Sequence, residues 1–334
     1  MKLSRRRLFE LLGLSGAAAA ASRPLAGLST TSAPATTELA ALLANQPAPK
    51  PLRPGDRLIA VAPGTWVDPQ DLIGPDSWKA IYARWGLELI VPPQAIARWR
   101  YFSASDSERS NALNKAWSDN SASGVVCISG GWGAARALEA GFKPNPACRW
   151  CVGFSDNSAL LLAQLAAGGR GGIHGWKGER VRQLLMGEAV APLQGRGLVA
   201  GVCEGPLVVT NLTVATHLIG TPWLPPLRGA ILVLEDTGEA PYRIDRLLTH
   251  WRTAGLLQGV AGIGLGRFSW KADDVLPGDL SMDEVLQERL SDLGVPVVSQ
   301  LPVGHGRPNE ALPQGGRARL DGRTGVLDLV AAGS

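Results

Sequence analysis

A serine at the junction of a predicted strand and a predicted helix is the residue best placed to do chemistry. The segment 150–158 reads Trp-Cys-Val-Gly-Phe-Ser-Asp-Asn-Ser, and leucines at 161, 162 and 165 then recur at helical spacing. The glycine two residues before Ser155 permits a sharp turn, and the free N–H groups of a helix start can hold a developing negative charge. The segment therefore offers a nucleophile, although serine is also a favoured helix cap.

A serine nucleophile needs a base that takes its proton and an acid that orients the base. The candidate bases are His174, His217, His250 and His305. His305 lies in a loop after a predicted strand, where functional residues concentrate. Glu235 and Asp236 end an apolar strand, and strand alternation points them to opposite faces. The residue types alone leave several Ser-His-acid combinations open.

A second loop of interest follows the apolar strand 125–128 and reads Gly130-Gly131-Trp132-Gly133. Its backbone N–H groups can hold an anionic oxygen, which an acyl-transfer enzyme requires. A dinucleotide site is the alternative, but Arg136 occupies the place of the third glycine of that fingerprint.

Cysteine and histidine spacing argues against a metal or redox centre. The histidines are far apart and show no ligand spacing, so we expect no metal site. Cys148 and Cys151 have the spacing of a redox pair. Cys151, however, sits in the strand before Ser155, which favours a buried core thiol. The oxidation state of these two cysteines stays open.

The first residues have the pattern of an export signal. Arg5, Arg6 and Arg7 precede a short apolar stretch and an alanine run, in the order typical of a twin-arginine signal. The apolar stretch is too short to span a membrane, so we expect a periplasmic protein without a stable membrane anchor. Charged residues up to Arg23 account for the whole formal net charge of +4. No basic stripe remains elsewhere, which argues against a nucleic-acid partner.

Strand and helix patterns alternate along the first half, which predicts an α/β fold with a parallel sheet and sites beyond its carboxyl strand ends. The second half has further strands and helices and ends in a hairpin around Asp321-Gly322. We expect an export signal and linker at 1–50, a parallel-sheet nucleophile domain at 51–175, an interdomain linker at 176–205, and a smaller α/β C-terminal domain with a β-rich tail at 206–334.

Several separated motifs, in the same order, resemble the LD-carboxypeptidases, a serine-peptidase family that also contains the microcin C self-immunity peptidase. The motifs are 52–56 with 61–63, 130–136, 153–156, 220–223, 231–236, 241–246 and Gly304-His305. The resemblance covers about residues 52 to 330. It implies an N-terminal domain like those of class I amidotransferases.

By this resemblance the catalytic triad falls on Ser155, Glu235 and His305. It further implies an oxyanion site at the N–H groups of Asp156 and Gly131, no cofactor, and a homodimer. The implied reaction is hydrolysis of the L,D peptide bond that releases terminal D-Ala from a murein tetrapeptide, through an acyl-enzyme. The serine and the other two triad members are then expected to meet across the domain junction.

The chain departs from the family pattern near the expected pocket. Gly64, Ser129, Trp176 and the pair Val209-Thr210 stand where the family usually has Ser, Arg, Pro and Gly-Gly. No triad residue is lost, so these changes bear on the substrate. The alternatives are a related amidase acting on a peptidyl-nucleotide or other small amide, and a non-catalytic murein-binding protein. The sequence leaves open whether the diamino acid is meso-diaminopimelate or lysine.

Overall fold

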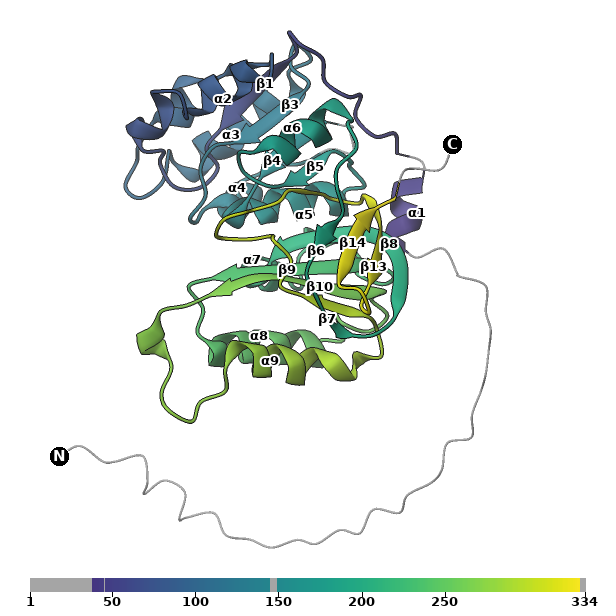
Figure 1. Ribbon diagram of the computed structural model, residues 1–334. Helices are drawn as coiled ribbons and strands as arrows, with labels where there is room; N and C mark the ends of the chain where they lie inside the picture. Colours follow the sequence, from purple (N-terminus) through teal and green to yellow (C-terminus); the bar gives the residue numbers. More distant parts are fainter. Residues whose placement is uncertain (1–37, 45, 145–148, 331–334) are drawn as a thin grey trace, which may run out of the picture. The chain divides into compact units, whose positions relative to one another are not determined.

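Two sheets and the helices around them form the part of the chain that the structure describes. The computed structural model describes residues 38–44, 46–144 and 149–330 (Figure 1). The predicted export signal at the start of the chain and Cys148 lie outside these residues. The fold class expected from the sequence, mixed α/β with a parallel sheet, is confirmed.

The first sheet has six strands in the order β12-β5-β4-β3-β1-β2. Its strands are β1 (Arg57–Val61), β2 (Glu88–Ile90), β3 (Gly124–Cys127), β4 (Trp150–Gly153), β5 (Gly172–His174) and β12 (Leu312–Pro313). The first five pair in parallel, while β12 runs antiparallel to β5. Their carboxyl ends therefore meet at one edge, where Ser155 and the glycine loop begin.

Helices cover both faces of this sheet because its strands are apolar on both sides. They are α1 (Glu38–Ala44), α2 (Trp78–Arg84), α3 (Asp106–Ser118), α4 (Ala134–Glu139), α5 (Ser158–Ala166) and α6 (Glu179–Met186). In β1, Leu58 and Ala60 pack with α2 and α6, while Ile59 and Val61 pack with α3, α4 and α5. The residues 158–165 of α5 are all buried, and α5 contacts both sheets.

The second sheet has eight strands in the order β6-β14-β13-β8-β9-β10-β11-β7. They are β6 (Leu193–Gln194), β7 (Arg196–Val199), β8 (Val202–Asn211), β9 (Ile231–Thr237), β10 (Gly262–Ser269), β11 (Val297–Ser299), β13 (Arg317–Asp321) and β14 (Val326–Leu329). Helices α7 (Leu212–Thr216), α8 (Pro241–Thr253) and α9 (Met282–Leu290) belong to this half, and α8 and α9 lie side by side along one face of the sheet (Figure 1). Strands β8 to β11 are parallel, and the hairpin β13–β14 forms where the sequence predicts it.

Some elements were not expected from local patterns. Helix α1 falls inside the predicted linker and buries Leu39 and Leu43. The segment 176–205, expected to join two domains, contains α6, β6 and β7. Strand β12 comes from the last part of the chain but completes the first sheet. These elements form through pairing or packing with residues distant in the sequence. Their own segments are too short to show a periodicity from which they could be predicted.

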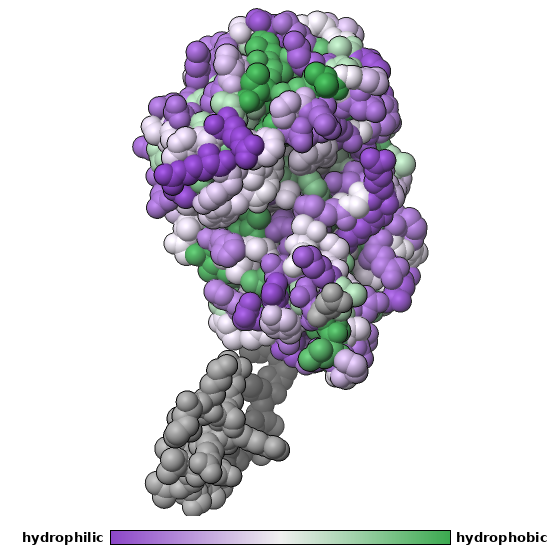
Figure 2. Space-filling view, turned by 90° about the vertical axis from the view of Figure 1, so that its left-hand side faces the viewer, coloured by the Kyte–Doolittle hydropathy of each residue, from purple (hydrophilic) through white to green (hydrophobic). Residues whose placement is uncertain are grey.

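The helices and the exposed apolar side chains bear on whether the described residues contain a membrane-spanning helix. None of the helices within 38–44, 46–144 and 149–330 is long and apolar enough to cross a bilayer. The exposed large apolar side chains, including Ile73, Tyr101, Trp132, Tyr242 and Leu276, come from separate segments. The face seen in Figure 2 is mostly hydrophilic with separate apolar patches.

Candidate active site

Ser155 stands on a strained turn between β4 and α5. Its φ of +61° is unusual for a residue with a side chain. A Cβ on Gly153 would lie 2.9 Å from the Cβ of Asn157, so this position requires glycine. Asn157 closes the turn from the other side, because its Nδ2 donates to the carbonyl oxygens of Ser129 (2.6 Å) and Phe154 (2.9 Å). The turn thus holds the Ser155 hydroxyl at the carboxyl edge of the first sheet.

His305 and Glu235 reach this hydroxyl from the second half of the chain. The Nε2 atom of His305 lies 3.0 Å from Ser155 Oγ, and its Nδ1 lies 2.8 Å from Glu235 Oε2. The backbone N–H of His305 donates to the same carboxylate oxygen at 3.2 Å. The structure therefore brings together the three residues that the resemblance assigned to the triad.

Glycine at position 304 lets the His305 loop approach the carboxylate. A Cβ on Gly304 would lie 2.7 Å from the Cβ of Glu235, and its φ is +104°. The Gly304 N–H donates to Asn309 Oδ1 at 3.0 Å, which fixes the loop from its far side. Glu235 at the end of β9 is fully buried, whereas a quarter of the His305 side chain is exposed. The imidazole thus faces the solvent side, and the carboxylate lies behind it.

The local electrostatics suit an imidazole that gains a proton during reaction. With the Nδ1 proton donated to Glu235, Nε2 is the acceptor for the hydroxyl proton of Ser155. A buried carboxylate beside the ring stabilises the imidazolium that then forms. Within the described residues, Glu235 Oε1 has no hydrogen-bond partner. The two hydrogen bonds from His305, from its ring and from its backbone N–H, are therefore the main contacts that stabilise this carboxylate.

The Gly130-Gly131 loop lies beside the serine, as an oxyanion site requires. A Cβ on Gly130 would stand 3.6 Å from the Cβ of Ser155. Both the N–H and the hydroxyl of Thr65 donate to the Gly130 carbonyl at 3.0 Å. Because C=O and N–H point in opposite directions across a trans peptide, the Gly131 N–H points away from Thr65. Its use as an oxyanion donor, together with the Asp156 N–H, stays a prediction.

Asp156 has a second, structural task. Its side chain is buried and accepts a hydrogen bond from the Ala134 N–H (2.8 Å) at the start of α4. Burial raises the pKa of Asp156 to about 6, while the bond from Ala134 and the charge of Arg109 act against this rise. The side chain thus ties the glycine loop to the turn that carries Ser155.

In the described part of the chain, the other candidate residues make no hydrogen bond to the side chains of Ser155, His305 or Glu235. His217 and His250 are exposed on or after helices α7 and α8. His174 is fully buried at the end of β5, and burial lowers its pKa to about 4. As strand alternation predicts, Asp236 points to the other face, where Thr213 N–H (2.8 Å) and Asn211 Nδ2 (3.1 Å) donate to it.

The cysteines that the structure describes are free thiols. Cys151 is free and buried, as expected for a core thiol, and Cys127 is free and buried as well. Among the described residues, no group of three or more His, Cys, Asp or Glu side chains could hold a metal ion.

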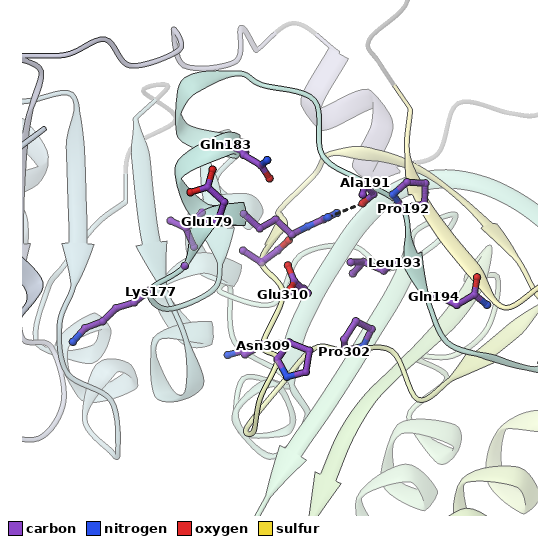
Figure 3. Close-up of a pocket in the computed structure, with 15 residues that line it drawn as sticks. Lys177, Glu179, Gln183, Ala191, Pro192, Leu193, Gln194, Pro302, Asn309 and Glu310 are labelled. Carbon is purple, nitrogen blue, oxygen red and sulfur yellow. Dashed lines mark hydrogen bonds between the residues drawn. The ribbon is translucent and has the colours of Figure 1, made fainter. Parts of the chain in front are cut away.

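A cavity of about 880 Å³ opens beside Ser155 and His305. Its walls include Thr65, Gly130, Trp176, Lys177 and Arg307. A neighbouring cavity of about 640 Å³ shares Lys177, Pro308 and Asn309 with it and extends past Glu310 to Gln183 and Gln194 (Figure 3). The hollow next to Ser155 thus has room for a peptide rather than for a single small group.

Sequence reasoning missed several residues that shape this region. The buried guanidinium of Arg109 donates to the carbonyl oxygens of Pro63 and Gly133 and so joins the loops on either side of the site. The ring of Phe154 lies 4.6 Å from that of His305. Lys177 and Arg307 provide positive charge on the cavity wall. The sequence signal for Lys177 was its place directly after Trp176, a departure from the family pattern.

Comparison with known proteins assigns the family. The LD-carboxypeptidase N-terminal domain matches residues 60–175, and the LD-carboxypeptidase C-terminal domain matches residues 204–320. A putative carboxypeptidase of Synechocystis sp. is 42% identical over 299 residues, 84% of this chain and 97% of the relative. The murein tetrapeptide carboxypeptidase of Pseudomonas aeruginosa is 31% identical over 254 residues, 68% and 81% of the two chains.

A solved structure agrees with these matches. The crystal structure of the muramoyltetrapeptide carboxypeptidase from Oxalobacter formigenes superposes with a TM-score of 0.71 at 26% identity, covering 82% of this chain and 97% of that one. The chain belongs to the LD-carboxypeptidase family of serine peptidases. It is a hydrolase of that family, as the motifs predicted.

Proposed function

We propose that this chain is a serine L,D-carboxypeptidase that releases terminal D-Ala from murein tetrapeptides. Ser155 is the nucleophile, His305 the general base and Glu235 the acid that orients it. The observation that carries the proposal is the continuous contact from hydroxyl through imidazole to buried carboxylate, at 3.0 and 2.8 Å, on a strained serine turn. The relatives named as carboxypeptidases of murein peptides support the substrate class.

In the acylation step, His305 Nε2 accepts the Ser155 proton while Oγ attacks the carbonyl carbon before D-Ala. The oxygen of that carbonyl becomes an anion, which the N–H groups of Asp156 and Gly131 stabilise. Glu235 stabilises the imidazolium through its contact with Nδ1. The imidazolium then gives its proton to the leaving amine, and D-Ala departs.

Deacylation uses the same groups in reverse roles. His305 takes a proton from a water molecule, and the resulting hydroxide attacks the acyl-enzyme carbonyl. Collapse of the second tetrahedral intermediate breaks the bond to Ser155 Oγ, returns the proton from His305 to this oxygen and frees the shortened peptide. These residues account for hydrolysis without a cofactor.

The decisive experiment is incubation of the purified chain with a disaccharide-tetrapeptide, with D-Ala release followed by mass spectrometry. Ser155→Ala should reduce the rate by at least about 10⁴-fold, because removal of a triad nucleophile leaves only binding and oxyanion stabilisation. Ser107→Ala, at an exposed serine of α3, is the matched control and should keep full activity. Full activity of Ser155→Ala, with its folding verified by circular dichroism, would refute the assignment.

The same assay separates the two alternatives. Turnover of an acyl-sulfamoyl adenylate but not of the tetrapeptide would point to the related amidase. Tetrapeptide binding without any turnover would point to a non-catalytic murein-binding protein. The contact between Ser155 and His305 favours catalysis over binding alone.

Location, assembly and domain limits belong to the same proposal. The twin-arginine pattern supports a periplasmic protein. Cell fractionation would decide this. We further propose a homodimer and a division into a nucleophile domain (51–175) and a C-terminal domain (206–334). Light scattering would measure the assembly.

A further inference from the structure

A half-buried lysine forms part of the wall of the cavity that holds Ser155 and His305. The Nζ atom of Lys177 donates to the backbone carbonyl of Asp76 at 3.1 Å and lies 4.5 Å from the ring centroid of Trp78. Lys177 also borders the neighbouring cavity, where Figure 3 shows its amine turned away from Glu310 and Gln183. Its charged end is thus directed toward the backbone of Asp76, a residue that also lines the cavity beside Ser155 and His305, here called the catalytic cavity.

An aromatic shelf, made of Trp78, Trp176 and Phe154, holds this lysine in place. The rings of Trp78 and Trp176 lie 5.4 Å apart, and those of Trp176 and Phe154 lie 5.8 Å apart. Phe154 in turn contacts the ring of His305. A fixed carbonyl contact and a fixed ring face leave the ammonium less conformational freedom than a surface lysine has. It is therefore preorganised relative to the reacting groups.

No carboxylate neutralises this ammonium at ion-pair distance within the described residues. The acid Asp76 also lines this cavity, but its side chain is 93% exposed and lies 3.9 Å from Arg84. Partial burial lowers the pKa of Lys177, and the more distant charges of Asp71 and Asp76 only partly oppose this. A partly desolvated cation without a counter-ion is costly in a structural role, and a ligand anion would remove that cost.

We propose that Lys177 binds a carboxylate of the peptide substrate and is a specificity-determining residue of the catalytic cavity. This inference rests on the proposed function, since a murein tetrapeptide carries carboxylates both on the leaving D-Ala and along its stem. Arg307 also borders the cavity, but it is exposed, and no hydrogen bond or ion pair holds it in the described part of the chain. The fixed ammonium of Lys177 is the better recognition element.

The test compares Lys177→Met with the wild type on the tetrapeptide and on versions in which each carboxylate is amidated in turn. Lys177→Met should lower kcat/KM on the unmodified peptide about tenfold, mostly through KM, because a charge-assisted hydrogen bond is lost equally from the bound substrate and the transition state. On the peptide whose bound carboxylate is already amidated, the substitution should cause no further loss. That peptide identifies which carboxylate Lys177 holds.

Two control variants make the result specific. Lys177→Arg keeps the charge and should retain most of the activity. Lys79→Met, at an exposed lysine next to Trp78, should leave kcat and KM unchanged. An equal loss on every peptide, or no loss on any, would overturn the inference. So would a carboxylate-dependent loss caused by Arg307→Met in place of Lys177→Met.

A binding measurement separates this inference from the proposed function. The Kd of the tetrapeptide is measured by calorimetry for Ser155→Ala with and without Lys177→Met. If the wild type hydrolyses the peptide but Lys177→Met does not raise the Kd of the tetrapeptide, the inference fails and the proposed function stands. If there is no hydrolysis but Lys177→Met still weakens binding about tenfold, the function fails and the inference stands. Neither hydrolysis nor binding would overturn both.

Discussion

Replacing Glu235 by glutamine tests whether the buried carboxylate acts by stabilising a charged His305. The substitution keeps the size and shape of the side chain but removes its negative charge. The amide also offers N–H groups to a ring whose Nδ1–H now donates to Oε2 at 2.8 Å. An amide nitrogen turned toward Nδ1 would favour the tautomer with its proton on Nε2, which cannot accept the proton of Ser155.

The expected size of the effect follows from the geometry. Both charges are delocalised, so their effective separation is about 4 Å, and at an effective dielectric of about 20 their interaction is worth about 4 kcal/mol. This attraction exists in the transition state, when the imidazole is protonated, and is small before it. Its loss should therefore lower kcat by about 10³-fold, with a further decrease from the wrong tautomer.

The free energy of unfolding of Glu235→Gln, in contrast to its activity, should increase or stay unchanged. Glu235 is fully buried, and in the described part of the chain its Oε1 atom accepts no hydrogen bond. Glutamine relieves the desolvation of a charge, so the free energy of unfolding should stay within about 1 kcal/mol of wild type or increase. Single-turnover kinetics on the tetrapeptide and urea denaturation measure the two effects on the same preparations.

Asp236→Asn is the matched control on the adjacent residue of β9. Asp236 accepts hydrogen bonds from Asn211 and from the N–H and hydroxyl of Thr213. In Asp236→Asn the amide nitrogen, itself a donor, faces these donors, so the free energy of unfolding should fall by about 1–3 kcal/mol. The activity should stay within about tenfold of wild type. If Glu235→Gln kept kcat within tenfold, or lost activity only in proportion to lost stability, the charge-stabilisation reasoning would be refuted.

Two further predictions concern the turn itself. Ser155→Gly should be more stable than Ser155→Ala by about 1 kcal/mol, because glycine adopts the φ of +61° without the strain that alanine meets. Urea midpoints measure this, and equal midpoints would show that the turn stores no strain. Asp156→Asn should gain stability over wild type on going from pH 4 to pH 7. Burial raises the pKa of Asp156 to about 6, so protonation stabilises the folded state below about pH 4, and this contribution is lost as the pH rises through 6. The difference between the two proteins should grow by about 2 kcal/mol over this range, and a difference independent of pH would contradict the reasoning.

Local patterns were sufficient to predict much of the fold. The capping boxes at Ser105 and Ser281 begin α3 and α9, and the apolar runs at 125–128 and before Glu235 became β3 and β9. Both capping boxes obey the same short-range rule, in which a serine and a glutamate three residues later satisfy each other's backbone N–H groups. The short strands β6, β7 and β12 were not predicted, because two to four residues carry no usable periodicity and exist only through their partners.

For the site, the sequence by itself determined the candidate groups. These are a serine on a glycine-dependent turn, a loop histidine, and adjacent acids on opposite faces of a strand. Residue types alone did not choose among four histidines, and it was family resemblance that singled out His305. Tertiary structure brought Nε2 of His305 to Ser155 across 150 positions of sequence and placed the half-buried Lys177 beside them. The physical reason is the distance in sequence between the residues that interact. Turns and caps depend on neighbouring residues, whereas a contact between distant loops depends on how two buried sheets and their glycines allow the chain to approach.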